Sequence, residues 1–177
     1  MNICLTPIDS DLDSENIVEF LIGNQFPYHV VEQPAEEDAR AFLASGVFSR
    51  PENAAFWIQI DSKRVGIINF QDMLDGNPMI DIRLDGQCRG KGIGAIALGV
   101  GTSCIFTENP NIDRIEGNTR IDNEAMRRIF TKNGYVKEAH YRDGWRVEGA
   151  MPLDSVSYAI IRRDWMTGVV TPVNWNS

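Results

Sequence analysis

The 177-residue chain carries 17 Lys and Arg against 25 Asp and Glu, so its formal net charge is −8. An apolar content of 43% and a charged content of 24% are ordinary for a globular protein with a full core, and we expect a single domain over residues 1–177. The charges are scattered, which argues against nucleic-acid binding through a basic surface and leaves room for a cationic amine as partner.

Further classes of protein are disfavoured by local features. No segment reaches about 18 apolar residues, and residues 1–13 lack the basic and apolar regions of a leader, so we expect a cytoplasmic protein without a membrane span. Cys4, Cys88 and Cys104 are odd in number and lack paired spacing with the two histidines. Neither a disulfide framework nor a metal site is therefore indicated.

Hydrophobic periodicity and capping residues divide the chain into strands and helices. We expect strands, in chain order, at residues 1–8, 54–60, 64–72, 79–84, 114–119, 135–142 and 155–162. We expect helices that begin at Asp13 or Ser14, Pro34, Ile93 and Asp122, and that end at Gly23, Gly46, Glu108 and Asn133. Asp143-Gly144 supplies turn chemistry before the last strand, and residues 165–177 form an irregular tail anchored by Trp165 and Trp175.

The connections between these elements predict their pairing. Short links make residues 54–60, 64–72 and 79–84 an antiparallel meander. The helix between residues 79–84 and 114–119 instead makes those two strands parallel neighbours. The expected fold is therefore mixed α/β (α+β), with a central twisted mixed β-sheet of about seven strands flanked by about four helices.

The chain is organised around residues 79–94, MIDIRLDGQCRGKGIG, where a strand meets a basic, glycine-rich bend that opens into a helix. Glycines allow backbone N–H groups to turn toward one point, and the helix start adds unpaired donors and a partial positive charge. Arg89 and Lys91 add formal charge at the same place. This arrangement is typical of a phosphate-binding loop.

Two other phosphate loops fit the bend less well. A Walker A loop needs one more residue between Gly86 and Gly90, and a hydroxyl residue where Gly92 stands. The dinucleotide pattern is satisfied formally by Gly90, Gly92 and Ala95. It is a weak signal, because the loop lies in mid-chain and no clean strand ends in an acid about 20 residues on. A nucleotide-binding oxidoreductase therefore rests only on this formal match.

With Gln87 included, the bend reads Gln-x-x-Gly-x-Gly and resembles the pyrophosphate loop of the GNAT superfamily of acyl-CoA N-acyltransferases. A second motif, residues 118–135 with the sequence NTRIDNEAMRRIFTKNGY, is similar to the strand, Asn, helix and terminal Gly-Phe/Tyr of that family. The resemblance covers roughly residues 1–165. The RGKGIG wording and the chain ending resemble the branch that includes ribosomal-protein alanine N-acetyltransferases.

The resemblance implies a bound acetyl-CoA and the residues that hold it. Backbone amides of the loop would bind the pyrophosphate, exposed strand N–H groups would meet the thioester carbonyl, and the second motif would contact the pantetheine arm and the adenosine phosphate. The implied residues are Gln87, Arg89, Gly90, Lys91, Gly92, Ile93 and Gly94 in the loop, Ile82, Arg83 and Leu84 in the strand, and Asn118, Asn123 and Arg127 (or Arg128 or Lys132) in the second motif. A plain helix cap is the alternative role of Asn123.

The resemblance also frames the catalytic candidates. Asp81 in the central strand, or Glu116 in its parallel neighbour, would act as the base, directly or through water. The chain departs from the family where a proton donor is expected, because Phe130 and Met126 stand where relatives have Tyr or Ser. Tyr158 or Tyr141 could substitute, water could serve, or the thiolate could leave unassisted.

Phe26, Tyr28 and His29, in the loop between the first two helices, are the candidates for acceptor binding, although the two aromatic rings could equally cap the core. The predicted function is transfer of an acetyl group from acetyl-CoA to a primary amine, either a peptide N-terminus or a small molecule, by direct attack in a ternary complex. An acyl-CoA binding or regulatory module of the same fold is the alternative, because the Tyr and Ser are missing. The aromatic tail could also pack on a second subunit in a homodimer.

Overall fold

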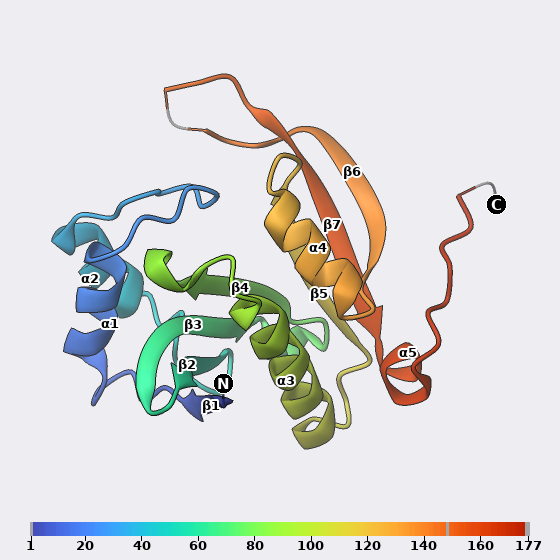
Figure 1. Cartoon of the computed structure of the whole chain (residues 1–177), viewed down its shortest axis with the longest axis horizontal. Coiled ribbons are helices and arrows are strands. Elements are labelled where there is room, and N and C mark those ends of the chain that lie inside the picture. The colour runs from blue at the N-terminus through green and yellow to red at the C-terminus, as the bar shows by residue number, and fades with distance from the viewer. Residues whose placement is uncertain (1, 148, 176–177) are drawn as a thin grey trace.

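The structure is a computed structural model that describes residues 2–147 and 149–175. One seven-stranded mixed sheet has the order β1-β2-β3-β4-β5-β7-β6, with five α-helices around it in the part described (Figure 1). The strands are β1 (Ile3–Pro7), β2 (Ala54–Ile60), β3 (Lys63–Gln71), β4 (Met79–Leu84), β5 (Arg114–Arg120), β6 (Val136–Trp145) and β7 (Leu153–Ile161). The helices are α1 (Ser14–Ile22), α2 (Glu36–Ala44), α3 (Ile93–Glu108), α4 (Glu124–Lys132) and α5 (Arg162–Thr167). The predicted fold class is confirmed.

The predicted strand pairing is also confirmed. β2, β3 and β4 form the antiparallel meander, and β4 runs parallel to β5. That parallel contact is short, because Met79 and Glu116 form its only register pair in the part described. Beyond Met79 the two strands splay apart, as Figure 1 shows. Every second N–H group of β4 past this point therefore faces a gap instead of a neighbouring strand.

Side-chain alternation along the strands divides the core between the two faces of the sheet. Phe56 and Ile68 belong to the larger cluster, under α3 and α4, whereas Trp57 and Ile67 belong to the smaller cluster, under α1 and α2. Gly101 lets α3 lie close to β3, since a Cβ there would come within 2.9 Å of the Phe70 ring. Because α3 and α4 cover one face of the sheet and α1 and α2 the other, the gap between β4 and β5 has helices on both sides.

Two expectations about local structure, the start of the second helix and the turn before the last strand, are wrong. Pro34 does not start the second helix, which begins at Glu36 after Ala35, where Asp38 Oδ2 accepts the Ala35 N–H at 3.2 Å. Asp143 and Gly144 lie inside β6 as a bulge, and the chain turns after them. The Asp143 N–H donates to Asp154 Oδ1 at 2.9 Å, which holds the bulge against β7.

The tail is partly helical, so the helices number five instead of the expected four in the part described. Arg162 begins α5, and its guanidinium donates to the carbonyl oxygens of Phe106 and Asn109 at the end of α3. Trp165 packs on Phe106, with a ring separation of 5.3 Å, and so lies against its own chain. Trp175 is 64% exposed. In the part of the chain described here, no helix has both the length and the apolar character needed to cross a membrane.

Candidate active site

Two cavities meet in the gap between β4 and β5. The first, of about 680 Å³, extends toward α2 and Trp145, and we call it the large cavity. The second, of about 420 Å³, lies over the glycine-rich bend and along α4, and we call it the loop cavity. The residues that line both are Tyr28, His29, Ile82, Arg83, Asn123 and Met126. A group held in one cavity can therefore reach a group held in the other at this junction.

The glycine-rich bend has the geometry of an anion cradle. Gly90 and Gly92 have φ angles of 73° and 80°, in the left-handed region that favours glycine. Gly92 precedes the first residue of α3, and no side chain caps that helix. The first N–H groups of α3 are therefore available to a ligand, and the helix dipole favours a negative one. The bend fits a diphosphate group.

The basic side chains around the bend differ in their roles. Arg89 donates from Nη2 to Leu84 O at 2.8 Å and also bonds Gln25 O, so its guanidinium ties the bend to the end of β4 and to the loop after α1. Arg128 and Lys132 line the loop cavity. Arg127 does not line it and donates instead to Ile121 O at 3.0 Å. Among the other predicted residues of the bend, Gly90, Gly92, Ile93 and Gly94 line the loop cavity, whereas Gln87 and Lys91 do not.

Asn123 and Asn118 both border the large cavity, and only Asn123 also reaches the loop cavity. Asn123 accepts from the Met126 N–H at 3.1 Å and donates to Thr119 Oγ1 at 3.0 Å, so it caps α4. Its second amide hydrogen has no partner among the described residues, and its side chain lines both cavities. Asn118 lines the large cavity only, donates to Met79 Sδ at 3.6 Å, and has a buried Oδ1 atom without a described partner.

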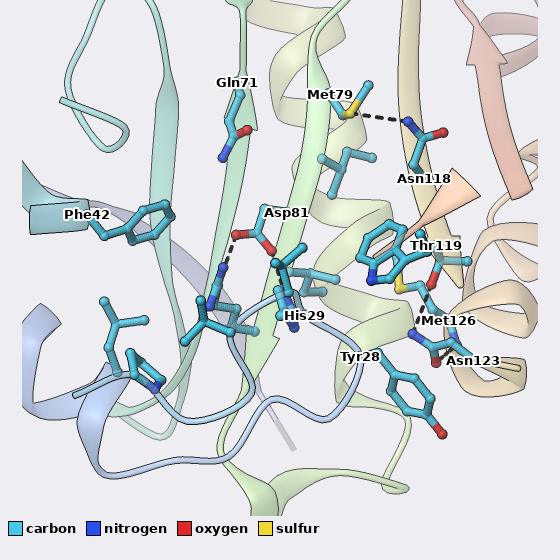
Figure 2. Close-up of a pocket in the computed structure, with 18 of the residues that line it drawn as sticks. Tyr28, His29, Phe42, Gln71, Met79, Asp81, Asn118, Thr119, Asn123 and Met126 are labelled. Carbon is cyan, nitrogen blue, oxygen red and sulfur yellow. Dashed lines mark hydrogen bonds and ion pairs between the residues drawn. The ribbon is translucent and has the colours of Figure 1, made fainter. Parts of the chain in front are cut away.

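Asp81 lies at the centre of the site and has partners at both carboxylate oxygens (Figure 2). Oδ1 is 2.8 Å from His29 Nε2, and Oδ2 accepts from Arg83 Nε at 2.9 Å. Burial by itself would raise the pKa of Asp81, but the charge of Arg83 and the bond to His29 together hold that pKa well below its usual range. Asp81 is therefore an ionised carboxylate.

His29 reaches Asp81 from a turn in the loop after α1. The His29 N–H donates to Phe26 O at 2.9 Å, and its ring stands edge-on to the Phe26 ring at 5.6 Å. Its Nδ1 atom is buried and has no hydrogen-bond partner among the described residues. Sequence reasoning named both His29 and Asp81 but did not join them, because 52 positions separate the two and no local pattern connects them.

The other two catalytic candidates lie outside the junction. Glu116 accepts from Arg114 Nε at 2.6 Å, and Arg114 also binds Glu138 at 2.5 Å. Glu116 lines neither cavity. Tyr158 stacks on Phe130 at 5.1 Å and lines a separate, shallow cavity along the outer side of α4.

Phe130 stands where relatives have a tyrosine. Its ring is 1% exposed and fills the space above Gly117, where an added Cβ would come within 2.3 Å of it. The ring belongs to the larger core cluster and also lines the large cavity. Phenylalanine therefore fills the packing position but offers no hydroxyl to the site.

The acceptor candidates divide between core and cavity. Phe26 is 2% exposed and belongs to the smaller core cluster, although one side of it lines the loop cavity. Tyr28 lines both cavities, and the Arg120 guanidinium lies 5.2 Å from its ring centre. In Figure 2, Tyr28 and Asn123 border the same part of the junction. Tyr28 is therefore better placed than Phe26 to contact a ligand.

The large cavity has mainly apolar walls with a few polar atoms. Val30, Val31 and Phe42 contribute apolar surface, and Asp38 and Asp81 are the acids among its described lining residues. Trp145 Nε1, like Asn118 Oδ1, is buried without a described partner. Among the described residues, no three His, Cys, Asp or Glu side chains gather as metal ligands would.

Comparison with known protein families gives one clear match. The sequence model described as acetyltransferase (GNAT) domain matches residues 2–136. No curated protein sequence matches the chain.

Solved structures resemble the fold over nearly its whole length. A probable acetyltransferase has a TM-score of 0.75 at 21% identity, covering 92% of this chain and 94% of that one. RimL, a ribosomal L7/L12 alpha-N-protein acetyltransferase in complex with coenzyme A, has a TM-score of 0.76 at 17% identity, with coverages of 91% and 94%. Spermidine N-acetyltransferase from Vibrio cholerae, in complex with CoA and spermine, has a TM-score of 0.78 at 14% identity, with coverages of 93% and 98%. At these identities the similarity establishes the fold.

Proposed function

The chain belongs to the GNAT acetyltransferase family, and from this we propose that it transfers an acetyl group from acetyl-CoA to a primary amine by direct attack in a ternary complex. The observation that carries the proposal is the meeting of the two cavities where β4 and β5 splay apart. One cavity has an anion cradle, and the other has room for an acceptor. The reaction needs the two substrates to be held side by side in this way.

The loop cavity would hold CoA. The N–H groups of residues 89–94 would bind the diphosphate, and the free amide hydrogen of Asn123 would bond the pantetheine arm. Arg128 and Lys132 are better placed than Arg127 to meet a phosphate at the adenosine end. The unpaired N–H groups of β4, among residues 82–84, would face the thioester carbonyl. The structures of RimL and of the V. cholerae enzyme, both containing CoA, support this assignment.

The large cavity would hold the acceptor, and its walls favour an amine carried on an apolar group. A polyamine such as spermine, which the V. cholerae enzyme binds, is best matched by several unpaired carboxylates. Here Asp81 is already neutralised by Arg83, and Asp38 accepts a backbone N–H. The unpaired Trp145 Nε1 and Asn118 Oδ1 could bond an amide group. The N-terminal residue of a peptide offers an amine, an apolar side chain and an amide group together.

Thermal-shift titration with acetyl-CoA, CoA and reduced nicotinamide dinucleotide tests the loop cavity. A ligand at about 100 times its dissociation constant stabilises the native state by roughly 2.7 kcal/mol, and we expect this for the CoA species only. Gly92→Glu should abolish the shift. Gly168→Glu is the matched control, because Gly168 has a similar φ of 70°, the same open surroundings and a place outside the cavities. An unshifted wild type would refute the proposal, and a shift with the nicotinamide alone would favour the oxidoreductase.

A panel of amines then tests the transfer. Release of CoA thiol should be at least tenfold faster, in kcat/KM, for short peptides with a free N-terminus and an apolar first residue than for spermine. A faster reaction with spermine would contradict the proposed acceptor class. Binding of CoA without release for any amine would favour the acyl-CoA binding module.

A further inference from the structure

We propose that His29 is the general base that takes the proton from the acceptor amine, and that Asp81 is its positioning residue. This inference rests on the proposed function. It revises the roles predicted from the sequence, where His29 is a candidate for acceptor binding and Asp81 a candidate for the base. It is carried by the contact between them and by the unpaired nitrogen that this contact leaves.

The hydrogen-bond geometry determines which nitrogen is available. A neutral imidazole has one N–H and one lone pair. Asp81 is an acceptor only, so the 2.8 Å contact requires the proton to be on Nε2 of His29 and leaves the lone pair on Nδ1. That Nδ1 is buried and unpartnered among the described residues. A buried acceptor without a partner is unfavourable, and an N–H of a bound amine that reaches Nδ1 would satisfy it.

Asp81 is itself a poor choice for the base. Both of its oxygens have partners, and its lowered pKa means that it has little tendency to accept a proton. A fixed carboxylate can instead hold an imidazole in one tautomer and stabilise the cation that forms when the ring is protonated. Arg83 completes this arrangement by holding the second oxygen of Asp81.

The position of His29 suits this role. Its ring lines both cavities, and therefore the place where amine and thioester would meet. The other charged groups near the ring are Arg83 on β4, Arg120 on β5, and Glu32 and Arg146, which line a smaller cavity together with His29. Of the four, Arg83 is bonded to Asp81 and Arg120 to Asp122.

His29 Nδ1 takes one proton from the amine nitrogen, whose lone pair forms a bond to the thioester carbonyl carbon. The carbon–sulfur bond breaks, and its electron pair leaves on sulfur, which takes a proton from solvent. His29 then returns its proton to solvent. The net products are the N-acetylated amine and CoA thiol.

Steady-state kinetics of His29→Gln between pH 5.5 and 9 test the proposal. Glutamine can still donate to Asp81 but cannot act as a base. We expect kcat/KM to fall about 100-fold or more. The wild type should lose activity on the acid side, because a protonated imidazole cannot act as a base, and this limb should be absent from the variant. The CoA-dependent thermal shift should remain, which shows that the fold is intact.

Asp81→Asn and His140→Gln complete the design. Asp81→Asn should lower kcat/KM about tenfold and move the acid limb to lower pH, because the imidazolium loses its carboxylate. His140 also bonds an aspartate but lines neither cavity, so His140→Gln should leave the profile unchanged.

The outcomes separate this inference from the proposed function. A wild type that binds CoA and acetylates no amine refutes the function, and with it this role for His29. An active wild type combined with a His29→Gln variant that keeps its rate and its acid limb overturns the inference alone. If His29→Gln no longer binds CoA, the pH profile of Asp81→Asn decides, and an unchanged profile there overturns the inference.

Discussion

The chain has two histidines, and each bonds an aspartate through Nε2, yet the two pairs differ in their surroundings. In the His29–Asp81 pair the side chains are 25% and 19% exposed, Arg83 holds the second carboxylate oxygen, and the ring lines two cavities. In the His140–Asp154 pair the side chains are 44% and 34% exposed, and neither cavity is nearby.

A short His–Asp contact is therefore not by itself a functional signal. The pKa of Asp154 is lowered first by the Asp143 N–H and then by His140, so this carboxylate mainly supports the bulge in β6. Asp81 makes no such backbone bond among the described residues and serves only Arg83 and His29. The charged partner Arg83, the cavities and the buried, unpaired Nδ1 distinguish the first pair. The predictions below test that distinction.

The largest expected difference is in stability. Asp81→Ala leaves the guanidinium of Arg83 without its partner, and Arg83 is only 13% exposed. Removing one member of such a pair should lower the free energy of unfolding by about 3 kcal/mol. Asp154→Ala, in the exposed pair, should leave the midpoint of urea unfolding almost unchanged. Equal midpoint shifts for the two variants, at constant m value, would mean that burial and Arg83 do not separate the pairs.

The ion pair of Asp81 with Arg83 should also appear in the pH dependence of the free energy of unfolding. Because the pKa of Asp81 is lowered on folding, its charge stabilises the native state above the unfolded value, about 3.9, and this contribution is lost as the pH falls through the folded value. The free energy of unfolding of the wild type should therefore exceed that of Asp81→Asn by about 1.5 kcal/mol from pH 7 to pH 5. This difference should shrink below about pH 4. Asp154 is present in both proteins, so its titration does not contribute to the difference between them. A difference that grows on acidification would contradict the ion-pair assignment.

The sequence predicted the fold well because periodicity and caps are local. The meander, the crossover and the helix that starts at Ile93 all follow from patterns within a few residues. The errors lie where residues typical of one local structure form a different one. Asp143-Gly144 has turn chemistry but forms a bulge tied to Asp154, and the tail folds as α5 because Arg162 caps the carbonyl groups at the end of α3.

For the candidate site, the sequence named individual residues but not the contacts between them. Gly90 and Gly92 of the bend have positive φ and an uncapped helix after them, as expected of a phosphate loop. The ion pair of Asp81 with Arg83 could have been suspected, since two residues on one strand at spacing two share a face. The partnership of Asp81 with His29 depends on how the loop after α1 folds back, and that follows from tertiary contacts such as the bond between Arg89 and Gln25.

The smallest expected effect concerns how Arg83 holds Asp81. Its guanidinium donates from Nε to Oδ2 and lies between the rings of Phe26 and Phe42, 5.2 and 5.3 Å from their centres. Arg83→Lys keeps the charge but loses the rigid planar donor and the stacking, so Asp81 stays ionised while its orientation loosens. We expect kcat/KM to fall about fivefold, or roughly 1 kcal/mol, with the acid limb of the profile unmoved.

Arg142→Lys is the matched control for that measurement, because Arg142 is the arginine whose charge acts on Asp154 in the exposed pair. It should change neither the rate nor the pH profile. A loss of activity in Arg142→Lys equal to that in Arg83→Lys would show that the effect is not specific to the contact of Arg83 with Asp81. A loss confined to Arg83→Lys would instead show that activity depends on how the Asp81 carboxylate is oriented toward His29. The His140–Asp154 pair needs no such orientation, because His140 lines neither cavity.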